Sequence, residues 1–287
     1  MKLTVSAPPF VKRDISASDI LWATVASLLP IIVISGYVFG LRAIAVFVVS
    51  IGSALGTEII IKHIRGKKVK LMDGGAAITG ILLALLLPYD VPLWIPMIGA
   101  IFAIAIVKEA FGGGGSNIFN PALAGWIFLM MSWAMHTVTV PGPVHPHPII
   151  NYSALRLAEV SPILLIVPPL FLIIIRYIDW RTPLSYLVST LVFLFLFKQN
   201  IAFVFTGIFH MGVFFFVTDP VTTPVTKKGR LIFGIGCGLL TVLYAMYASF
   251  VEGIGLSILL MNALTPLIDR FTVPKPIAAR DIYEDLR

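Results

Sequence analysis

The stretch Gly112-Gly-Gly-Gly-Ser-Asn-Ile-Phe-Asn-Pro121 separates two strongly apolar segments, 94–107 and 122–133. Four glycines, two asparagines and a proline continue a helix only at a cost in free energy. In a lipid bilayer such backbone must be buried in protein or line a polar site, because lipid cannot satisfy its N–H and C=O groups. The stretch therefore predicts either a ligand site between two broken helices or a loop at the membrane surface.

The composition of the chain is that of a membrane protein. Of its 287 residues 58% are hydrophobic and only 12% are charged. The net charge of +7 is divided among short clusters between apolar runs, which is typical of membrane loops and predicts contact with lipid and none with nucleic acid. The single cysteine, Cys237, excludes an internal disulfide and a four-thiolate metal or iron–sulfur centre built by this chain alone. No metal site is predicted.

Ten apolar segments predict an all-α polytopic membrane protein with about ten transmembrane helices. Their approximate limits are 20–40, 43–61, 74–88, 92–110, 121–138, 159–177, 183–197, 201–217, 230–250 and 253–269. The third and seventh are shorter than the ~20 residues that a full span needs. Short segments in transporter-like chains often form half-helices around a central site.

The distribution of Lys and Arg predicts the orientation in the plasma membrane. With the N-terminus in the cytoplasm and sides alternating, all but three of the 21 Lys and Arg residues fall on the inside. The exceptions are Arg42, Arg156 and Lys198. We therefore expect both termini to be cytoplasmic.

Ten spans divide into two halves of five within a single membrane domain. We expect a first half at 1–138, a second half at 159–287, and an outer loop at 139–158. An odd number of spans in each half predicts that the halves are inverted relative to each other. Weak support comes from Thr79-Gly80-Ile81 and Thr206-Gly207-Ile208, which fall in corresponding spans.

The first break offers two amide side chains, Asn117 and Asn120, which lie on one face if the segment is helical. An amide both donates and accepts hydrogen bonds, which suits the edge of a planar, neutral heterocycle. Glycines would let the backbone approach such a ring closely. The alternative for Asn120 is an N-cap of the helix that begins at Pro121.

The second break is Thr218-Asp-Pro-Val-Thr-Thr-Pro-Val-Thr-Lys-Lys-Gly-Arg230. Four threonines and two prolines predict a rigid, hydrogen-bonding hairpin. Asp219 could anchor a ligand or a cation, but the residues alone favour an ion pair with Lys227, Lys228 or Arg230. Acidic residues near the inner ends of other spans are candidates for an ion path or for pairing with Lys62, Lys70 or Lys108. They are Glu58, Asp73 and Glu109.

Both breaks resemble the two hallmark segments of the RnfD/NqrB family of membrane subunits. The likeness is carried by 112–123 and 218–234, with support from 73–84 and 262–269, and it runs nearly end to end. The compact length favours the RnfD branch over NqrB.

The resemblance implies an electron-transfer subunit of an Rnf-type complex. Such a complex relays electrons between ferredoxin-linked partners and NAD or another acceptor, and couples this to Na⁺ or H⁺ translocation. The implied partners are RnfA, RnfB, RnfC, RnfE and RnfG. The resemblance also implies an embedded, non-covalent flavin, riboflavin or FMN, at the asparagine-containing break. The predicted cofactor-binding residues are Asn117, Asn120, Gly113, Gly114, Thr218 and Asp219.

The chain departs from the family pattern in the loop before the sixth span. Family members usually carry a second flavin, FMN, joined through its phosphate to a threonine in a Ser/Thr-x-Ala-Thr-like motif. Here the nearest match is Asn151-Tyr-Ser-Ala-Leu155, which places Ser153 where the threonine belongs. The absence of that threonine argues against a covalent FMN. A serine hydroxyl could form the same phosphoester, and Ser153 is otherwise a candidate helix N-cap.

The chain contains no pattern of a self-contained catalyst. Gly-x-Ser-x-Gly, His-Glu-x-x-His and Walker A sequences are all absent, so no catalytic residue is predicted. The main alternative to an electron relay is a small-solute channel or secondary transporter whose site lies at the two broken helices. A third interpretation is a scaffold subunit without flavin. A visible absorption spectrum of the purified chain discriminates between these functions.

Overall fold

The computed structural model describes residues 16–66, 73–134 and 156–274, and this part of the chain is built from helices. Two of the helical spans continue into π-helical segments, at 103–109 and 212–216, and 3₁₀ turns at 157–160 and 201–205 precede α7 and α9. The helices are α1 (Ala17–Phe39), α2 (Leu41–Ile64), α3 (Gly75–Leu86), α4 (Trp94–Phe102), α5 (Pro121–Ser132), α7 (Pro162–Ile174), α8 (Arg181–Leu196), α9 (Gly207–Met211), α10 (Lys227–Tyr247) and α11 (Phe250–Thr272).

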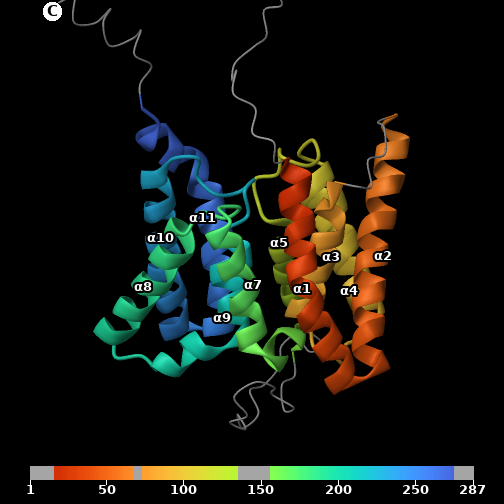
Figure 1. The fold of residues 1–287 in the computed structure, drawn as a ribbon, viewed down its shortest axis with the longest axis horizontal. Coiled ribbons are helices and arrows are strands. Elements are labelled where there is room, and N and C mark those ends of the chain that lie inside the picture. Colours follow the sequence, from red (N-terminus) through yellow and green to blue (C-terminus); the bar gives the residue numbers. More distant parts are fainter. Residues whose placement is uncertain (1–15, 67–72, 135–155, 275–287) are drawn as a thin grey trace, which may run out of the picture.

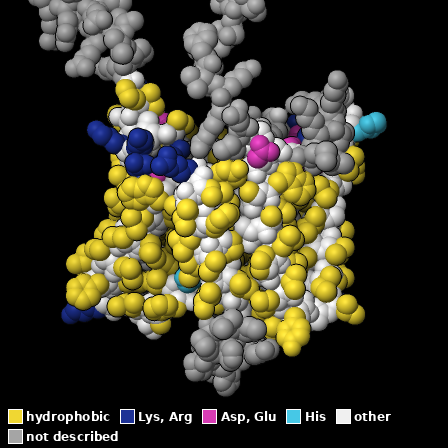
Figure 2. Space-filling view, in the orientation of Figure 1, with side chains coloured by type: hydrophobic (Ala, Val, Ile, Leu, Met, Phe, Trp, Pro, Cys, Tyr) yellow, Lys and Arg dark blue, Asp and Glu magenta, His cyan; other side chains and the backbone are white. Residues whose placement is uncertain are grey.

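The surface of the helical bundle is that of a polytopic membrane protein. Four helices, α1, α2, α10 and α11, are long and apolar enough to cross a membrane. Large apolar side chains face outward along the bundle, while the charged side chains of this view gather mainly at one end (Figure 2). Outward apolar side chains are stable there because they contact lipid. The predicted all-α membrane architecture is therefore confirmed.

The ten predicted spans each contain a helix, but several helices are shorter than expected. The third span is short as predicted, since α3 has 12 residues. The fifth was predicted to reach residue 138, yet α5 ends at Ser132. Hydropathy reports how strongly a segment prefers lipid over water. It does not show where the backbone hydrogen bonds of a helix end or change their spacing. The two π-helical segments were missed for the same reason.

The two halves of the chain lie side by side in the bundle (Figure 1). Contacts of α1 with α7, and of α5 with α11, join the first half to the second. The two breaks lie at the same end of the bundle, where α1 begins. The inverted relationship of the halves stays a prediction, and most of the predicted outer loop lies outside the described residues.

Glycines let the helices of the second half pack closely. In α10, a Cβ added at Gly234 or Gly238 would overlap the hydroxyl of Ser185 or Ser189 of α8. The Ser189 hydroxyl instead donates to the Gly234 carbonyl at 3.3 Å. Small residues at a helix interface allow the backbones to approach, which is how helices associate in lipid. This packing provides a firm support for the break that precedes α10.

Candidate functional site

The two breaks meet in space although about a hundred residues separate them in the sequence. The Asn120 side-chain amide donates to Asp219 Oδ2 at 2.9 Å. The backbone N–H of Asn120 is 3.4 Å from Oδ1 of Asn262, in the middle of α11. The Asn262 amide in turn donates to the Thr222 carbonyl at 3.2 Å. Asn262 was noted in the sequence only as part of the family likeness, although a lone amide in an apolar span signals a polar role.

The first break needs its glycines for backbone conformation. Gly112, Gly113 and Gly115 have φ values of 119°, 102° and 93°, a region that side chains with a Cβ rarely adopt. The loop follows the π-helical segment 103–109 and is closed by a hydrogen bond from the Gly113 N–H to the Lys108 carbonyl at 3.1 Å. The residues of this break are therefore fixed in a definite shape.

The two asparagines of the first break have different roles. Asn120 caps α5, since its Oδ1 accepts from the Leu123 N–H at 3.1 Å, so the N-cap alternative is confirmed. Both of its side-chain polar atoms are thus engaged within the protein. The Asn117 amide donates to the Phe119 carbonyl at 3.0 Å, but within the described residues its Oδ1 accepts no hydrogen bond. Asn117 is the residue that leaves an acceptor for a ligand.

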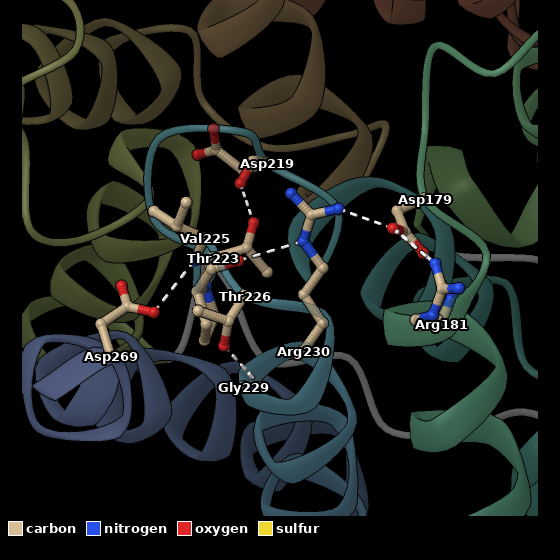
Figure 3. Close-up of polar contacts among 10 residues, drawn as sticks. Asp179, Arg181, Asp219, Thr223, Val225, Thr226, Gly229, Arg230 and Asp269 are labelled. Atoms are coloured by element: carbon tan, nitrogen blue, oxygen red, sulfur yellow. Dashed lines mark hydrogen bonds and ion pairs between the residues drawn. The ribbon is translucent and has the colours of Figure 1, made fainter. Parts of the chain in front are cut away.

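Hydrogen bonds with residues of α10 and α11 hold the second break in place (Figure 3). The Val225 N–H donates to Asp269 Oδ1 of α11 at 3.0 Å, and the Thr226 hydroxyl caps α10 through the Gly229 N–H at 2.9 Å. The Arg230 guanidinium donates to the Pro224 carbonyl at 3.0 Å. The hydrogen bonding predicted for this break is confirmed, and its rigidity stays a prediction.

The expected ion pair of Asp219 with Lys227, Lys228 or Arg230 was wrong. Arg230 pairs with Asp179 at 2.7 Å, and Arg181 contacts the same carboxylate at 3.1 Å. The reason is geometric, because Asp179 lies in the connection between α7 and α8, which α10 packs against. Asp219 accepts instead from the Val221 N–H at 3.1 Å and from Asn120.

The two aspartates differ in their electrostatic surroundings. Burial raises the pKa of Asp179, but the hydrogen bonds from the Arg181 N–H and the Arg230 guanidinium outweigh it and lower the pKa below its usual value. Burial also raises the pKa of Asp219, and its hydrogen bonds to Val221 and Asn120 offset this only in part. Asp219 therefore ionises less readily than an ordinary aspartate, as expected for a desolvated carboxylate with no ion-pair partner among the described residues.

A cavity of about 350 Å³ opens between the two breaks. Its lining includes polar residues of both breaks and apolar residues of α3 and the π-helical segment 212–216. The predicted site residues Asn117, Asn120, Gly114, Thr218 and Asp219 all line it. Gly113 is not among the lining residues, and its α-carbon faces the Glu109 carboxylate. Ser153 lies outside the described residues.

One wall of the cavity carries charged side chains that were not predicted from the sequence as part of the site. Lys108 is the only basic residue among the described residues that line the cavity, and Asp73 is an acidic one. Lys108 Nζ lies 3.0 Å from Glu58 Oε1, which Lys62 also contacts. The predicted pairing of Glu58 with lysines is thus confirmed, whereas Glu109 pairs with Arg65 at 3.5 Å. The signal in the sequence was a lysine inside an apolar segment.

The residues that line the cavity fit a flavin ring. The ring edge carries one N–H between two carbonyl groups, so it needs an acceptor such as Asn117 Oδ1 and donors such as Lys108 Nζ. Its flat faces need apolar neighbours, which Ile78 and Phe215 supply. The volume falls within the ~300–1,000 Å³ of pockets that bury small ligands.

Fold and cavity together define a polytopic helical membrane protein with a cavity between two broken helices, lined by polar and apolar residues. The chain belongs to the NQR2, RnfD, RnfE family, whose sequence profile matches residues 4–278.

Three relatives of the chain are subunits of ion-translocating complexes. The chain is 41% identical to a subunit of the ion-translocating oxidoreductase complex of Methanosarcina acetivorans, covering 96% of each chain. It is 38% identical to the corresponding subunit of the Na(+)-translocating ferredoxin:NAD(+) oxidoreductase complex of Acetobacterium woodii, covering 95% of this chain and 94% of the relative. It is 37% identical to the proton-translocating counterpart of Clostridium ljungdahlii, covering 96% of each. The resemblance found in the two breaks is therefore confirmed.

Proposed function

We propose that this chain is the flavin-bearing electron-transfer subunit of an Rnf-type complex, relaying electrons between ferredoxin-linked partners and NAD or another acceptor. The observation that carries the proposal is the cavity lined by both breaks, where the Asn117 amide oxygen accepts no hydrogen bond from the described residues. Relatives with 37–41% identity are named as subunits of ion-translocating oxidoreductase complexes, which supports the same role.

The flavin, riboflavin or FMN, would be held without a covalent bond and would supply one- and two-electron transfer. Asn117 accepts a hydrogen bond from the ring edge, and Gly114 lets the backbone come close. Asn120, Thr218 and Asp219 form the part of the wall that joins the two halves. The apolar lining excludes water and so strengthens the polar contacts. The covalent flavin at Ser153 stays a separate prediction, tested by fluorescence of the denatured chain in a gel.

The setting that we propose is the plasma membrane, with both termini in the cytoplasm and the cavity opening at the cytoplasmic end. The gathering of charged side chains at that end supports this orientation (Figure 2). The proposed partners are the other subunits of the complex, RnfA, RnfB, RnfC, RnfE and RnfG. The coupled ion is Na⁺ or H⁺, and relatives of nearly equal identity carry each of these names.

The test is the visible spectrum of the full chain purified in detergent and supplied with riboflavin or FMN. We expect one flavin per chain to remain after gel filtration, with its absorption retained and its fluorescence quenched. A chain that binds no flavin, yet conducts a small solute when reconstituted in liposomes, would contradict the relay and favour the transporter alternative.

A further inference from the structure

Lys108 occupies an unusual position for a lysine in a membrane protein. It lies in the π-helical segment 103–109, one residue before that segment ends, and only 4% of its surface is exposed. Its side chain lines the cavity. A buried ammonium costs several kcal/mol of desolvation unless other groups compensate it. π-helical turns of this kind are frequent at functional sites.

The compensation that the protein itself provides for Lys108 is incomplete. Its Nζ contacts Glu58 Oε1 at 3.0 Å, but Lys62 contacts the same oxygen from one turn along α2. The second oxygen, Glu58 Oε2, is buried and has no hydrogen-bond partner among the described residues. Two ammonium groups thus share one carboxylate oxygen. Lys62 has further help from Asp73 at 3.6 Å, whereas Lys108 has no second carboxylate within ion-pair distance in the described part of the chain.

The surroundings of Lys108 add positive charge and leave space for its head group. Helix α3 begins at Gly75, where an added Cβ would come within 2.8 Å of Lys108 Nζ and would require the ammonium to shift. The N-terminus of a helix carries partial positive charge, and a lysine there is electrostatically unfavourable. The arrangement becomes favourable when negative charge enters the cavity beside it.

The negative charge that suits the cavity is a single, delocalised one. Besides the one ammonium of Lys108, the described lining carries two carboxylates, Asp73 and Asp219. A phosphate carries nearly two negative charges, and the one ammonium in the described lining would balance only part of them. A reduced flavin ring carries at most one negative charge, spread over several atoms. The lining therefore fits the reduced ring beside Lys108 better than it fits a phosphate.

Resting on the proposed flavin site, we propose that Lys108 stabilises the anionic reduced form of the bound flavin and thereby raises its reduction potential. Reduction adds two electrons from the donor and takes up one proton from water, which leaves the ring with one negative charge. The Lys108 ammonium, already in place at the cavity wall, balances that charge. The positioning of Lys108 by Gly75 and Glu58 makes this a property of the fold.

The test compares reduction potentials of riboflavin bound to the full chain in detergent, measured by absorption during titration with dithionite against redox dyes. We expect Lys108→Met to weaken binding of the reduced form about tenfold relative to the oxidised form. For a two-electron couple this is a shift of about 30 mV to lower potential. Lys108→Arg should restore most of the potential. Lys108→Gln retains a donor for Glu58 and serves if the methionine variant does not fold.

Lys62→Met is the matched control, because Lys62 contacts the same Glu58 oxygen but does not line the cavity. It should change the potential much less than Lys108→Met. An equal shift would mean that overall charge, and not the position of Lys108, sets the potential, and the inference would be overturned.

Affinity measurements separate the remaining outcomes. If the Lys108 variants keep the wild-type potential but bind FMN more weakly than riboflavin, Lys108 holds a phosphate and the inference is wrong. If wild-type protein binds riboflavin and no variant changes its potential, the inference fails while the flavin site stands. If wild-type protein binds no flavin, the proposed function itself fails.

Discussion

The glycine–asparagine break at 112–120 and the threonine–proline break at 218–226 each connect two helical segments, but they are held in shape in different ways. Each follows a π-helical segment and each ends at the N-cap of a helix. The first takes its shape from three glycines with positive φ, and its Asn117 oxygen accepts no hydrogen bond within the described part of the chain. The second is held by side chains of α10 and α11, with Arg230 of α10 anchored in turn by Asp179. One break thus presents groups to a ligand, and the other is a support that keeps the cavity in shape.

Asn120 lies in the first break and donates a hydrogen bond to Asp219 of the second. Its substitution should therefore have the largest effect on stability and on flavin binding. Asn120→Ala removes an N-cap, worth about 1 kcal/mol, and leaves Oδ2 of the Asp219 carboxylate without the hydrogen bond from Asn120, worth about 1–3 kcal/mol, while Oδ1 keeps its bond from the Val221 N–H. We expect a large loss of thermal stability and of flavin binding, measured by heating followed by gel filtration. Asn200→Ala is the control, because Asn200 caps an exposed 3₁₀ turn and its loss should change little. Equal losses of thermal stability in the two variants would contradict the role of Asn120 in joining the two breaks.

Gly113→Ala should have the next largest effect and should act on the first break alone. At φ 102° an added Cβ is strained by at least about 1–2 kcal/mol, although its contact with Glu109 would be an ordinary van der Waals contact. We expect weaker flavin binding with a smaller loss of stability than in Asn120→Ala. In the control Gly52→Ala, in α2, the Cβ meets nothing within 4 Å, and the change should be neutral or stabilising. Unaltered flavin affinity in Gly113→Ala would show that the loop is adaptable.

Arg230→Gln should loosen the second break by an intermediate amount. It removes a partly exposed ion pair with Asp179 and a hydrogen bond to the Pro224 carbonyl, together worth roughly 1–2 kcal/mol. Arg181→Gln removes only a contact local to the start of α8 and should cost less. Thermal unfolding of the two variants measures the difference, and a greater loss in Arg181→Gln would contradict the bracing role.

Acid should narrow the gap in stability between wild type and Arg230→Gln. The pKa of Asp179 is lowered in the folded protein. Its pairing therefore stabilises the fold above the ordinary carboxyl pKa and is lost as the pH falls through the folded value. Unfolding measured at neutral and at acidic pH tests this, and a gap that stays constant would show that Asp179 is not the partner that matters.

Asn117→Ala should have the smallest effect on stability and a selective effect on the ligand. Its amide donates only to a carbonyl two residues away, and its oxygen has no partner within the described part of the chain. We expect a change in thermal stability of within about 1 kcal/mol and riboflavin affinity reduced up to about tenfold, the value of one hydrogen bond. A loss of thermal stability as large as that of Asn120→Ala would show that Asn117 supports the fold.

Sequence reasoning predicted the number and nature of the spans because hydropathy reports directly on lipid contact. It also found both breaks, since glycine and proline disrupt helices by local sterics alone. It could not predict that Asp219 pairs with Asn120 and not with Arg230, because that depends on how α10 packs against α8 and brings Arg230 to Asp179. Lys108 was predicted only as a possible ion-pair partner, because its place on the cavity wall depends on how the helices pack.

The most direct test of a single site built from both breaks is a riboflavin titration of three full-length proteins: wild type, Asn117→Ala and Asp219→Asn. Quenching of flavin fluorescence gives the stoichiometry and the dissociation constant. We predict one saturable flavin per wild-type chain, and weaker binding when either break is altered. Wild-type binding that neither substitution weakens, or no binding by the wild-type chain, would contradict a flavin site between the two breaks.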